Sequence, residues 1–384
     1  MSTPIDSLQI GMHWFAERPG GLDRMFKALI ESLPEQGVNV RGLVAGTPGV
    51  LESSGGLVHP FAQAQAGLGS RLWRARTHSS QLKRARMPDV IAAHFALYTA
   101  PTVGVFRGVP RVVHFHGPWA SESGAEGRGS LSRAARHALE RMVYRGGTRH
   151  IVLSEAFGRI LHTEYGVRED RIRVVRGCVD VERFDTGLTR RQARERLDLP
   201  QDRPQIFCVR RLVSRMGLED LIDAMFVVKQ SVPDVLLTIA GKGPLEPLLQ
   251  GRIIARGLER HVRLAGFVPD ADLPLWYTAA DITVVPTVAL EGFGLTTIES
   301  LAAGTPVLVT PIGGLPEAVA PLSPDLVLPS TGFHALGSGM ADALLGVRAL
   351  PGAAACREYA RTHFANPVVA AQVAHVYREA IDAF

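Results

Sequence analysis

Residues 282–310 read ITVVPTVALEGFGLTTIESLAAGTPVLVT. An apolar run at 282–286 is followed by a glycine-rich turn, an apolar helical pattern from about residue 295 and a second apolar run at 306–310. A strand, a helix and another strand in that order are typical of a parallel sheet with crossover helices. The stretch therefore predicts an α/β fold.

The same alternation recurs along the chain in two series. The first occupies the N-terminal half, and the second resumes with QIFCV at 205–209, after the polar, proline-bounded segment 186–204. Such a break is typical of a surface helix and a linker between two similar α/β halves. We therefore predict domains at residues 1–185 and 186–366, followed by a C-terminal helix at 367–384 that packs back on the N-terminal domain.

The composition excludes several classes of protein. The 384 residues are 46% hydrophobic and 21% charged, so the chain can bury a large core and is not mainly disordered. Lysine and arginine (42) exceed aspartate and glutamate (37) only slightly, which permits an anionic ligand without predicting a nucleic-acid partner. Three widely spaced cysteines predict neither a disulfide framework nor a zinc site. We expect no signal peptide and no membrane span, and we expect a cytoplasmic location.

The turn at 291–294 has the features of an anion site. A helix that begins near Leu295 leaves unpaired N–H groups and the positive end of its dipole at the turn. Glu291 and Glu299 would repel a phosphate, but they can accept hydrogen bonds from hydroxyl groups on either side of a diphosphate. A nucleotide sugar has that arrangement. The alternative is that Glu299 only complements the helix dipole in the first turn and that Glu291 is a solvated loop acid.

Residues 291–317 also resemble the signature of retaining glycosyltransferase family 4, the glycosyl transferases group 1. The signature has two glutamates separated by seven residues, an alanine-rich helix, a GTPV strand and a GG-x-PE turn. The resemblance continues through most of the chain, in RPGGLDRM, VHFHG, IVLSEAF, VDVERF, IAGKGPL and LAGFVPDADLPLWYTAADITVVPT. It implies the GT-B fold, in which two Rossmann-like α/β domains face each other across a cleft. The N-terminal domain would bind the acceptor and the C-terminal domain the nucleotide sugar.

The resemblance further implies a reaction and a set of site residues. A sugar moves with retention, without a metal or other cofactor, from a nucleoside-diphosphate sugar to the hydroxyl of a small molecule or saccharide. We expect a uridine donor, because such donors are frequent in that family. The expected catalytic residues are Arg211, His116, Glu291 and Arg215. The expected donor-binding residues are Gly20, Gly21, Gly241, Gly292, Phe293, Gly294, Leu295, Thr296 and Glu299.

The sequence departs from the family pattern in two places, at RGCVD (176–180), where PNGVD is common, and at position 216, which bears on the chemistry. The resembled proteins have an arginine after the QIFCV strand and a lysine five residues later, which neutralise the leaving diphosphate. Arg211 matches the arginine, but Met216 stands where the lysine is expected. Methionine has neither charge nor donor. Either Arg215 or Arg210 supplies the missing positive charge, or the leaving group is less stabilised.

Three histidines lie near strand ends. His114 and His116 are two residues apart, so their side chains project to one face of a strand. This pattern suits a metal, a proton-transfer site or one packed and one exposed histidine, but no further metal ligands are evident. By the resemblance His116 contacts the donor sugar. His94 could line the acceptor side, although a buried, hydrogen-bonded histidine is the more common interpretation.

Two other functions remain open from the sequence. The same fold occurs in nucleotide-sugar epimerases, and the methionine at position 216 is also compatible with a catalytically weak, donor-binding partner subunit. The basic stretch 71–86, which contains no acid, is interpreted first as a solvated helix face. Its alternative is a peripheral contact with anionic lipid at the inner face of a membrane.

Overall fold

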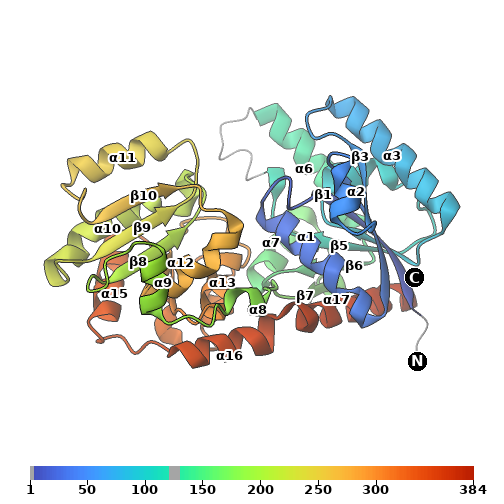
Figure 1. Cartoon of the computed structure of the whole chain (residues 1–384). Helices are drawn as coiled ribbons and strands as arrows, with labels where there is room; N and C mark the ends of the chain where they lie inside the picture. Colours follow the sequence, from blue (N-terminus) through green and yellow to red (C-terminus); the bar gives the residue numbers. More distant parts are fainter. Residues whose placement is uncertain (1–3, 121–129) are drawn as a thin grey trace. The chain divides into compact units, whose positions relative to one another are not determined.

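The computed structural model describes residues 4–120 and 130–384. It divides into two compact units, which are coloured along the chain in Figure 1. Unit 1 comprises Met1–Cys178 and Asn366–Phe384, and unit 2 comprises Val179–Ala365. The boundary therefore lies after Cys178 rather than after residue 185. The reason is that the Val179 N–H donates to the Phe364 carbonyl at 2.8 Å, which fixes the following residues to unit 2.

Unit 1 contains a seven-stranded sheet in the order β3-β2-β1-β4-β5-β6-β7, and the neighbouring strands are parallel. Its strands are apolar and buried because helices cover the sheet. They are β1 (Ile5–His13), β2 (Val38–Ala45), β3 (Val58–Ala62), β4 (Val90–Ala93), β5 (Arg111–Phe115), β6 (Arg149–Val152) and β7 (Ile172–Val174).

The helices of unit 1 come from both ends of the chain. They are α1 (Gly21–Ser32), η1 (Pro34–Gln36), α2 (Gly49–Ser53), α3 (Leu68–Ala85), α4 (Ala96–Thr99), η2 (Ala100–Thr102), α6 (Ser130–Arg145), α7 (Glu155–Tyr165), η3 (Glu169–Arg171) and α17 (Asn366–Asp382). The terminal helix α17 packs against α1, β5 and β6 (red in Figure 1). Its Glu379 accepts hydrogen bonds from Arg149 and Arg173, so charged contacts hold it as well as apolar ones.

Unit 2 contains a five-stranded sheet in the order β10-β9-β8-β11-β12, also with parallel neighbours. The strands are β8 (Gln205–Val209), β9 (Leu236–Ala240), β10 (Val262–Gly266), β11 (Ile282–Val285) and β12 (Val307–Val309). The helices are α8 (Val181–Phe184), α9 (Arg190–Arg196), η4 (Ser214–Met216), α10 (Leu218–Ser231), α11 (Glu246–Ala255), η5 (Asp270–Asp272), α12 (Leu273–Ala279), α13 (Leu295–Ala302), α14 (Leu315–Val319), η6 (Pro324–Leu326), α15 (Phe333–Leu344) and α16 (Ala353–Phe364).

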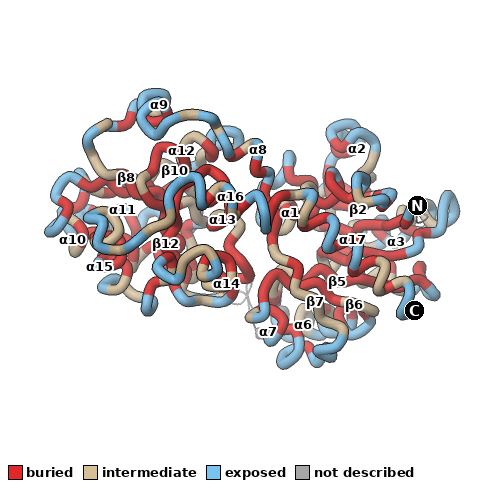
Figure 2. Tube along the Cα trace, turned by 90° about the horizontal axis from the view of Figure 1, so that it is seen from below, coloured by how far each residue is buried: buried red, intermediate tan, exposed pale blue. Residues whose placement is uncertain are grey.

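Each unit has its own hydrophobic core. Figure 2 shows the strands as buried tube, with exposed tube in the outer turns and helix faces. In unit 2 the core forms between β8, β9, β11 and the helices α10 and α15. Within the described residues, no helix is both long and apolar enough to cross a membrane.

The strand orders locate the ligand-binding end of each sheet. Both orders begin at an inner strand, run to one edge and then continue from the other side of that strand, as in a Rossmann-like fold. The prediction of two Rossmann-like α/β domains is therefore confirmed. The order reverses between β1 and β4 in unit 1 and between β8 and β11 in unit 2. We call these two places the switch points, because ligands of such sheets bind beside the carboxyl ends of the strands there.

Candidate functional site

The switch point of unit 2 brings together two chain segments that the sequence analysis singled out. Residues 210–217 follow β8, and residues 286–294 follow β11, the neighbouring parallel strand. Because parallel strands end at the same edge of the sheet, the two segments meet there. Arg210, Arg211 and Arg215 lie on the first segment, and Glu291 lies on the second.

An ion pair joins these segments. Nη2 of Arg210 lies 2.9 Å from Oε2 of Glu291, and the two side chains are only 7% and 12% exposed. The Thr287 hydroxyl donates to the same carboxylate oxygen at 3.2 Å, so Glu291 is not a solvated loop acid. Nε of Arg210 is buried and has no hydrogen-bond partner within residues 4–120 and 130–384. An unpaired buried guanidinium N–H is costly, and a bound anion would satisfy it.

Arg215 lies against the Glu291 turn. Its Nη1 donates to the Leu290 carbonyl at 2.9 Å, and its own carbonyl accepts from the Val288 N–H at 3.0 Å. Leu290 has a φ of +53°, a left-handed conformation that costs a non-glycine residue about 1–2 kcal/mol. Backbone outliers of this kind cluster at binding sites. The Arg211 side chain, which was expected to be the principal cation, is exposed.

Met216 belongs to the core of unit 2. It is 5% exposed and lies in the same apolar cluster as Leu212 and Leu218. The next residue, Gly217, has a φ of +70°, and a Cβ there would lie 2.0 Å from the Pro286 carbonyl oxygen. The turn after β8 is therefore pressed against the chain after β11. An apolar side chain suits this environment, whereas an ammonium group at position 216 would have to reach out of the core.

The glycine-rich turn leads into α13 at Leu295, as expected. Gly294 precedes the helix with a φ of +75°, a left-handed conformation that favours glycine, and a Cβ there would also lie 2.6 Å from Cδ2 of Leu315. The hydroxyl groups of Thr296 and Thr297 are buried and have no partner in the part of the chain that the structure describes. Unpaired donors and the positive end of the helix dipole thus coincide at this turn.

Three further members of the expected donor set, Glu299, Phe293 and Gly292, are buried. Glu299 is 3% exposed, and its Oε2 accepts a hydrogen bond from the Tyr277 hydroxyl at 3.0 Å. It lies beyond the first turn of α13, which contains no acidic residue, so it does not serve simply as a complement to the helix dipole. Phe293 packs edge-to-face on Phe364, so only its backbone can reach a ligand. Gly292 is buried in the same turn.

Gly241, at the end of β9, supports the backbone of Arg210. A Cβ on Gly241 would lie 1.8 Å from the Arg210 carbonyl oxygen, and the Arg210 N–H donates to the Ala240 carbonyl at 2.9 Å. The Gly241 N–H donates in turn to the Gly266 carbonyl at 2.7 Å. The position therefore fixes the course of the chain beneath the ion pair.

The switch point of unit 1 contains the Gly20-Gly21 turn. Helix α1 begins at Gly21 and has no side-chain cap. Asp23 does not cap it, because its Oδ1 accepts the His13 N–H at 2.9 Å and so ties the helix to the end of β1. Asp23 is 2% exposed, and burial raises the pKa of its carboxyl to about 7. The turn is tight: a Cβ on Gly20 would lie only 3.1 Å from Oδ2 of Asp23.

Three stacked histidines lie near the carboxyl ends of β4 and β5, and His94 packs edge-to-face on Phe26 of α1. His94 follows β4, His114 lies in β5 and His116 follows β5. Nδ1 of His94 is 3.2 Å from Nε2 of His116, and the rings of His94 and His114 stack with their centroids 4.1 Å apart. His94 and His114 are buried, whereas His116 is partly exposed. His94 is thus a buried, hydrogen-bonded histidine, and His116 is the outer member of the group.

Burial keeps all three rings neutral near pH 7. It lowers the pKa of His116 to about 4 and the pKa of His94 and of His114 well below the ordinary value of 6.5. Each charged ring would also repel its neighbours, which lowers the pKa of His94 and His114 further. The group can therefore exchange hydrogen bonds with a ligand, but it presents no fixed positive charge.

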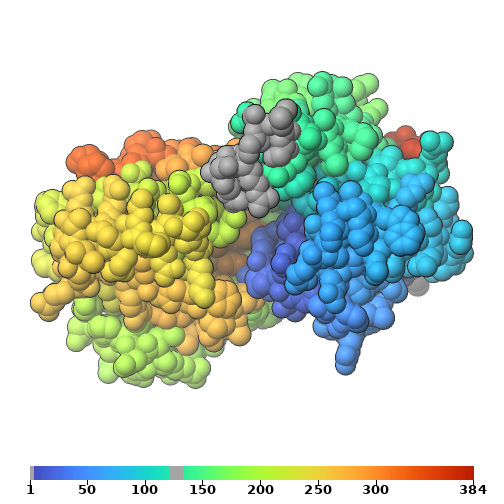
Figure 3. All heavy atoms as spheres, turned by 90° about the horizontal axis from the view of Figure 1, so that it is seen from above, coloured from blue at the N-terminus to red at the C-terminus, as the bar shows by residue number. Residues whose placement is uncertain are grey.

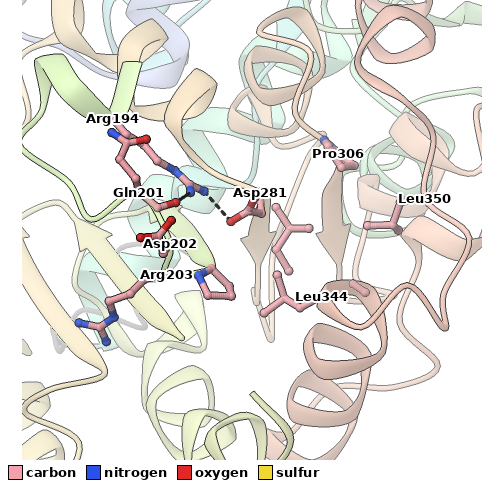
Figure 4. Close-up of a pocket in the computed structure, with 11 residues that line it drawn as sticks. Arg194, Gln201, Asp202, Arg203, Asp281, Pro306, Leu344 and Leu350 are labelled. Carbon is pink, nitrogen blue, oxygen red and sulfur yellow. Dashed lines mark hydrogen bonds and ion pairs between the residues drawn. The ribbon is translucent and has the colours of Figure 1, made fainter. Parts of the chain in front are cut away.

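A hollow lies at the ends of the strands of unit 2 that are opposite to the switch point. It measures about 440 Å³ and is lined by residues that precede β8, β11 and β12, among them Pro204, Asp281 and Pro306 (Figure 4). Arg194 donates to Asp281 at 2.7 Å across it, and Arg190 lies 3.0 Å from the same carboxylate. Arg190 and Arg194 are thus paired with Asp281 within the unit, and none of the expected site residues lines the hollow.

Comparison with known proteins gives consistent matches. A family model described as "Glycosyl transferases group 1" matches residues 189–363, and one described as "Glycosyltransferase Family 4" matches residues 19–183. A glycogen synthase of Mycobacterium tuberculosis is 30% identical over 239 residues, which cover 62% of this chain and 55% of that protein. The chain thus spans about half the length of this relative. A 2-deoxystreptamine glucosyltransferase of Streptomyces kanamyceticus is 28% identical over 322 residues, covering 77% of this chain and 82% of that protein.

Solved structures match over nearly the whole chain. Anabaena Alr3699/HepE, solved in complex with UDP and glucose, matches with a TM-score of 0.79 and 19% identity and covers 98% of this chain and 100% of that one. A similarity at this level of identity supports the fold alone. No role was predicted from the sequence for Gln9, Tyr277 or Tyr377. Gln9 is one of several polar residues in β1, beside Asp6, Ser7 and His13, so no signal in the sequence set it apart.

Proposed function

Because the chain belongs to the group 1 glycosyltransferases and has the GT-B fold, we propose that it transfers a sugar from a nucleoside-diphosphate sugar to an acceptor hydroxyl. Unit 2 binds the donor and unit 1 the acceptor. The donor is a uridine diphosphate sugar, as in the complexes of the similar Anabaena protein. The acceptor is a hydroxylated small molecule or a saccharide.

The observation that carries this proposal is the Arg210–Glu291 pair at the switch point of unit 2. The buried, unpaired Nε of Arg210 is a ready donor to a diphosphate oxygen. Arg211 and Arg215 add positive charge from the same segment, and the N-terminus of α13 adds N–H groups. Glu291 accepts from a sugar hydroxyl and Glu299 from a ribose hydroxyl. Gly241, Gly292 and Gly294 keep the backbone close to the ligand.

The proposed chemistry depends on charge that develops as the bond breaks. The sugar becomes oxocarbenium-like while negative charge grows on the β-phosphate oxygen, so fixed arginines stabilise the transition state more than the ground state. The sugar is transferred with retention, and a phosphate oxygen of the leaving group takes the acceptor proton. With arginines and helix N–H groups in this role, the proposal requires no metal. In unit 1, His116 accepts a hydrogen bond from a substrate hydroxyl.

Ligand binding tests the donor class directly. We expect UDP at 100 times its Kd to stabilise unit 2 by about 2.7 kcal/mol, which corresponds to a rise in Tm of about 5–10 °C. ADP and GDP serve as matched ligands. Arg210→Met removes the proposed diphosphate contact and should reduce the stabilisation by UDP. Arg260 is exposed near the start of β10, so Arg260→Met serves as the control. If none of the nucleotides raised the Tm, the result would count against the donor-binding role of unit 2.

Product analysis tests the reaction. Incubation with a UDP-sugar and candidate acceptors should release UDP and give a product whose anomeric proton coupling matches that of the donor. The rate should be unchanged by EDTA. An inverted anomeric configuration would refute the retaining mechanism, and complete loss of activity in EDTA would refute metal independence.

The two alternative functions are less well supported. An epimerase would convert the donor without an acceptor, which the donor-alone incubation detects. A weak partner subunit would gain activity in Met216→Lys. We expect no such gain, because Met216 lies in the core and Arg210 and Arg215 already supply positive charge beside Glu291.

We also propose that α3 of unit 1 makes a peripheral contact with an anionic membrane. The helix has no acidic residue, and it lies in the light blue region of Figure 3. Its Trp73 is 65% exposed, and the neighbouring Arg74 is exposed as well. Arg84 lies three turns further on the same face as Trp73. Other basic residues are used internally, since Arg71 donates to the Tyr98 hydroxyl and Lys83 to the Val105 carbonyl.

Vesicle sedimentation tests this contact. The protein should bind vesicles that contain phosphatidylglycerol more tightly than neutral vesicles, and binding should weaken with salt. Trp73→Ser with Arg84→Gln should reduce the affinity by about tenfold, since each basic residue near such a surface contributes about 1 kcal/mol. Equal binding by this variant and by the control Arg260→Met would contradict the proposal.

A further inference from the structure

A chain of hydrogen bonds in unit 1 runs from strand β1 to His116, and its first members set its direction. The Ser7 hydroxyl donates to the Asn39 carbonyl at 3.2 Å, so its oxygen is left to accept. The Gln9 side chain lies 2.9 Å from that oxygen and must donate to it through Nε2. This fixes the orientation of the amide, and Oε1 of Gln9 points toward the histidines.

Oε1 of Gln9 can only accept hydrogen bonds. It lies 2.9 Å from Nε2 of His94 and 3.1 Å from the Tyr377 hydroxyl, so both of these groups donate to it. The Tyr377 hydroxyl has then used its proton and must accept from Nε2 of His114, 2.9 Å away. His94 and His114 consequently carry their ring protons on Nε2.

The same reasoning extends to His116. A neutral His94 that is protonated on Nε2 has a lone pair on Nδ1. This Nδ1 faces Nε2 of His116 at 3.2 Å, so His116 must donate through Nε2. The low pKa of His94 and of His116, caused by burial, excludes a doubly protonated ring near neutral pH. The lone pair of His116 is therefore on Nδ1.

We infer that Gln9 is a positioning residue that fixes, through His94, the tautomer in which His116 offers Nδ1 to the substrate as a hydrogen-bond acceptor. The substrate group is a hydroxyl, which donates to Nδ1, and not a carbonyl or phosphate oxygen, which could only accept. This last step rests on the proposed function, whereas the assignment of the tautomer does not. Gln9, His94 and His116 are called the relay below.

The unmodified protein tests the assignment without any variant. Long-range ¹H–¹⁵N correlation spectra of the ¹⁵N-labelled full chain distinguish a protonated from an unprotonated ring nitrogen. At pH 7.5 we expect Nε2 of His116 to be protonated and Nδ1 to be bare, with His116→Gln identifying the signals. A protonated Nδ1 on His116 would overturn the inference.

Two substitutions at buried positions then distinguish the relay from the hydrogen bond that Tyr377 donates to Gln9. Gln9→Met removes the acceptor at the start of the relay and should convert the single tautomer of His116 into a mixture. Tyr377→Phe also removes one hydrogen bond to Gln9 but leaves the Gln9–His94–His116 path intact. It should preserve the tautomer. A His116 tautomer unchanged in Gln9→Met, or lost equally in both variants, would contradict a positioning role for Gln9.

Kinetics connect the tautomer to the reaction. If the hydroxyl is held in both ground and transition states, Gln9→Met should raise the KM of the substrate by about tenfold with little change in kcat. A normal KM in a variant with mixed tautomers would refute the link to the substrate. No transfer by any form of the protein, with the expected tautomer present, would instead refute the proposed function and leave the tautomer assignment standing.

Discussion

At the switch point of unit 2, an arginine and a glutamate form a largely buried ion pair, whereas at that of unit 1, neutral histidines and a glutamine share a chain of hydrogen bonds. The two sheets follow the same strand order in these regions. The topology therefore selects the place where a ligand can bind in each unit. It does not select the chemistry of that place.

The difference follows from the residues that come after each strand. Arg210 and Glu291 follow β8 and β11, and their charged side chains pair with each other; under the proposed function they bind a diphosphate and sugar hydroxyl groups. His94 and His116 follow β4 and β5, and their burial removes the charge and leaves directed hydrogen bonds. Two similar α/β units can thus divide the recognition of an anionic and an uncharged substrate.

Acid should give the largest difference between the two units, because their stabilities depend on pH differently. Within the described residues, the histidines whose pKa is lowered by burial lie in unit 1, namely His13, His59, His94, His114, His116 and His150. They stay neutral in the folded unit, while the unfolded chain binds protons below about pH 6.5. Their stabilising contribution is therefore complete above pH 6.5 and is lost as the pH falls toward 4.

The carboxyl groups act in the other direction or at lower pH. Burial raises the pKa of Asp23 to about 7 and also raises the pKa of Glu140, so both carboxyl groups add stability to unit 1 as the pH falls, but these two groups are outnumbered by the six histidines. In unit 2, hydrogen bonds from Arg252 lower the pKa of Asp223, so its contribution is lost only at stronger acid. Hydrogen exchange measured by mass spectrometry between pH 7 and 4 should show unit 1 opening first. Earlier opening of unit 2 would contradict this prediction.

Removal of the arginine should be the next largest effect. Arg210→Met leaves the buried Glu291 without its counterion, so we expect the free energy of unfolding of unit 2 to fall by about 3–5 kcal/mol in urea denaturation. Adding Glu291→Gln should restore much of the stability, because no buried charge is left unpaired. The exposed control Arg260→Met should change it by less than about 0.5 kcal/mol. No recovery in the double variant would argue against the pair.

Glycine substitutions sharpen the comparison within unit 2. Gly217 and Gly257 both have a left-handed φ, +70° and +59°, but only Gly217 is crowded, by the Pro286 carbonyl. Gly257→Ala should therefore cost about 1–2 kcal/mol from backbone strain alone. Gly217→Ala should cost at least about 1 kcal/mol more, since the turn after β8 must move. If denaturant titrations gave equal losses of stability for the two variants, the turn after β8 would not be packed tightly against the chain after β11.

Much of the fold could be predicted from local patterns. The run at 205–209 is β8, and helix α13 begins at Leu295, because apolar periodicity and glycine turns are local signals. The polar segment 186–204 was predicted to be a surface helix and a linker at the start of the second domain, and it does lie within unit 2, but its contacts with the rest of the unit were not predicted. Arg194 is buried there and donates to the Ala279 carbonyl and to Asp281. Such a contact joins residues distant in sequence, and composition does not reveal it.

The sequence indicated which types of residue form the site, but not which side chains contact each other there. Glu291 and Glu299 could be singled out because two acids beside a glycine-rich turn at a helix start suit hydroxyl groups next to a diphosphate, and Arg215 because the family resemblance implies a cation where Met216 stands. The partner of Glu291 is Arg210 rather than the exposed Arg211, which depends on how the turn after β8 leaves the sheet. The contact between Gln9 and Tyr377 spans nearly the whole chain. Only the folded unit 1 brings these two side chains together.

Isothermal titration of UDP into the wild-type protein and into Arg210→Met/Glu291→Gln tests the central claim most directly. The double variant removes one positive and one negative charge, so the net charge of unit 2 is unchanged. It removes the guanidinium and the carboxylate that are proposed to bind the donor. We predict measurable binding to the wild type and at least a tenfold weaker affinity in the double variant. The same Kd for both proteins would contradict the account.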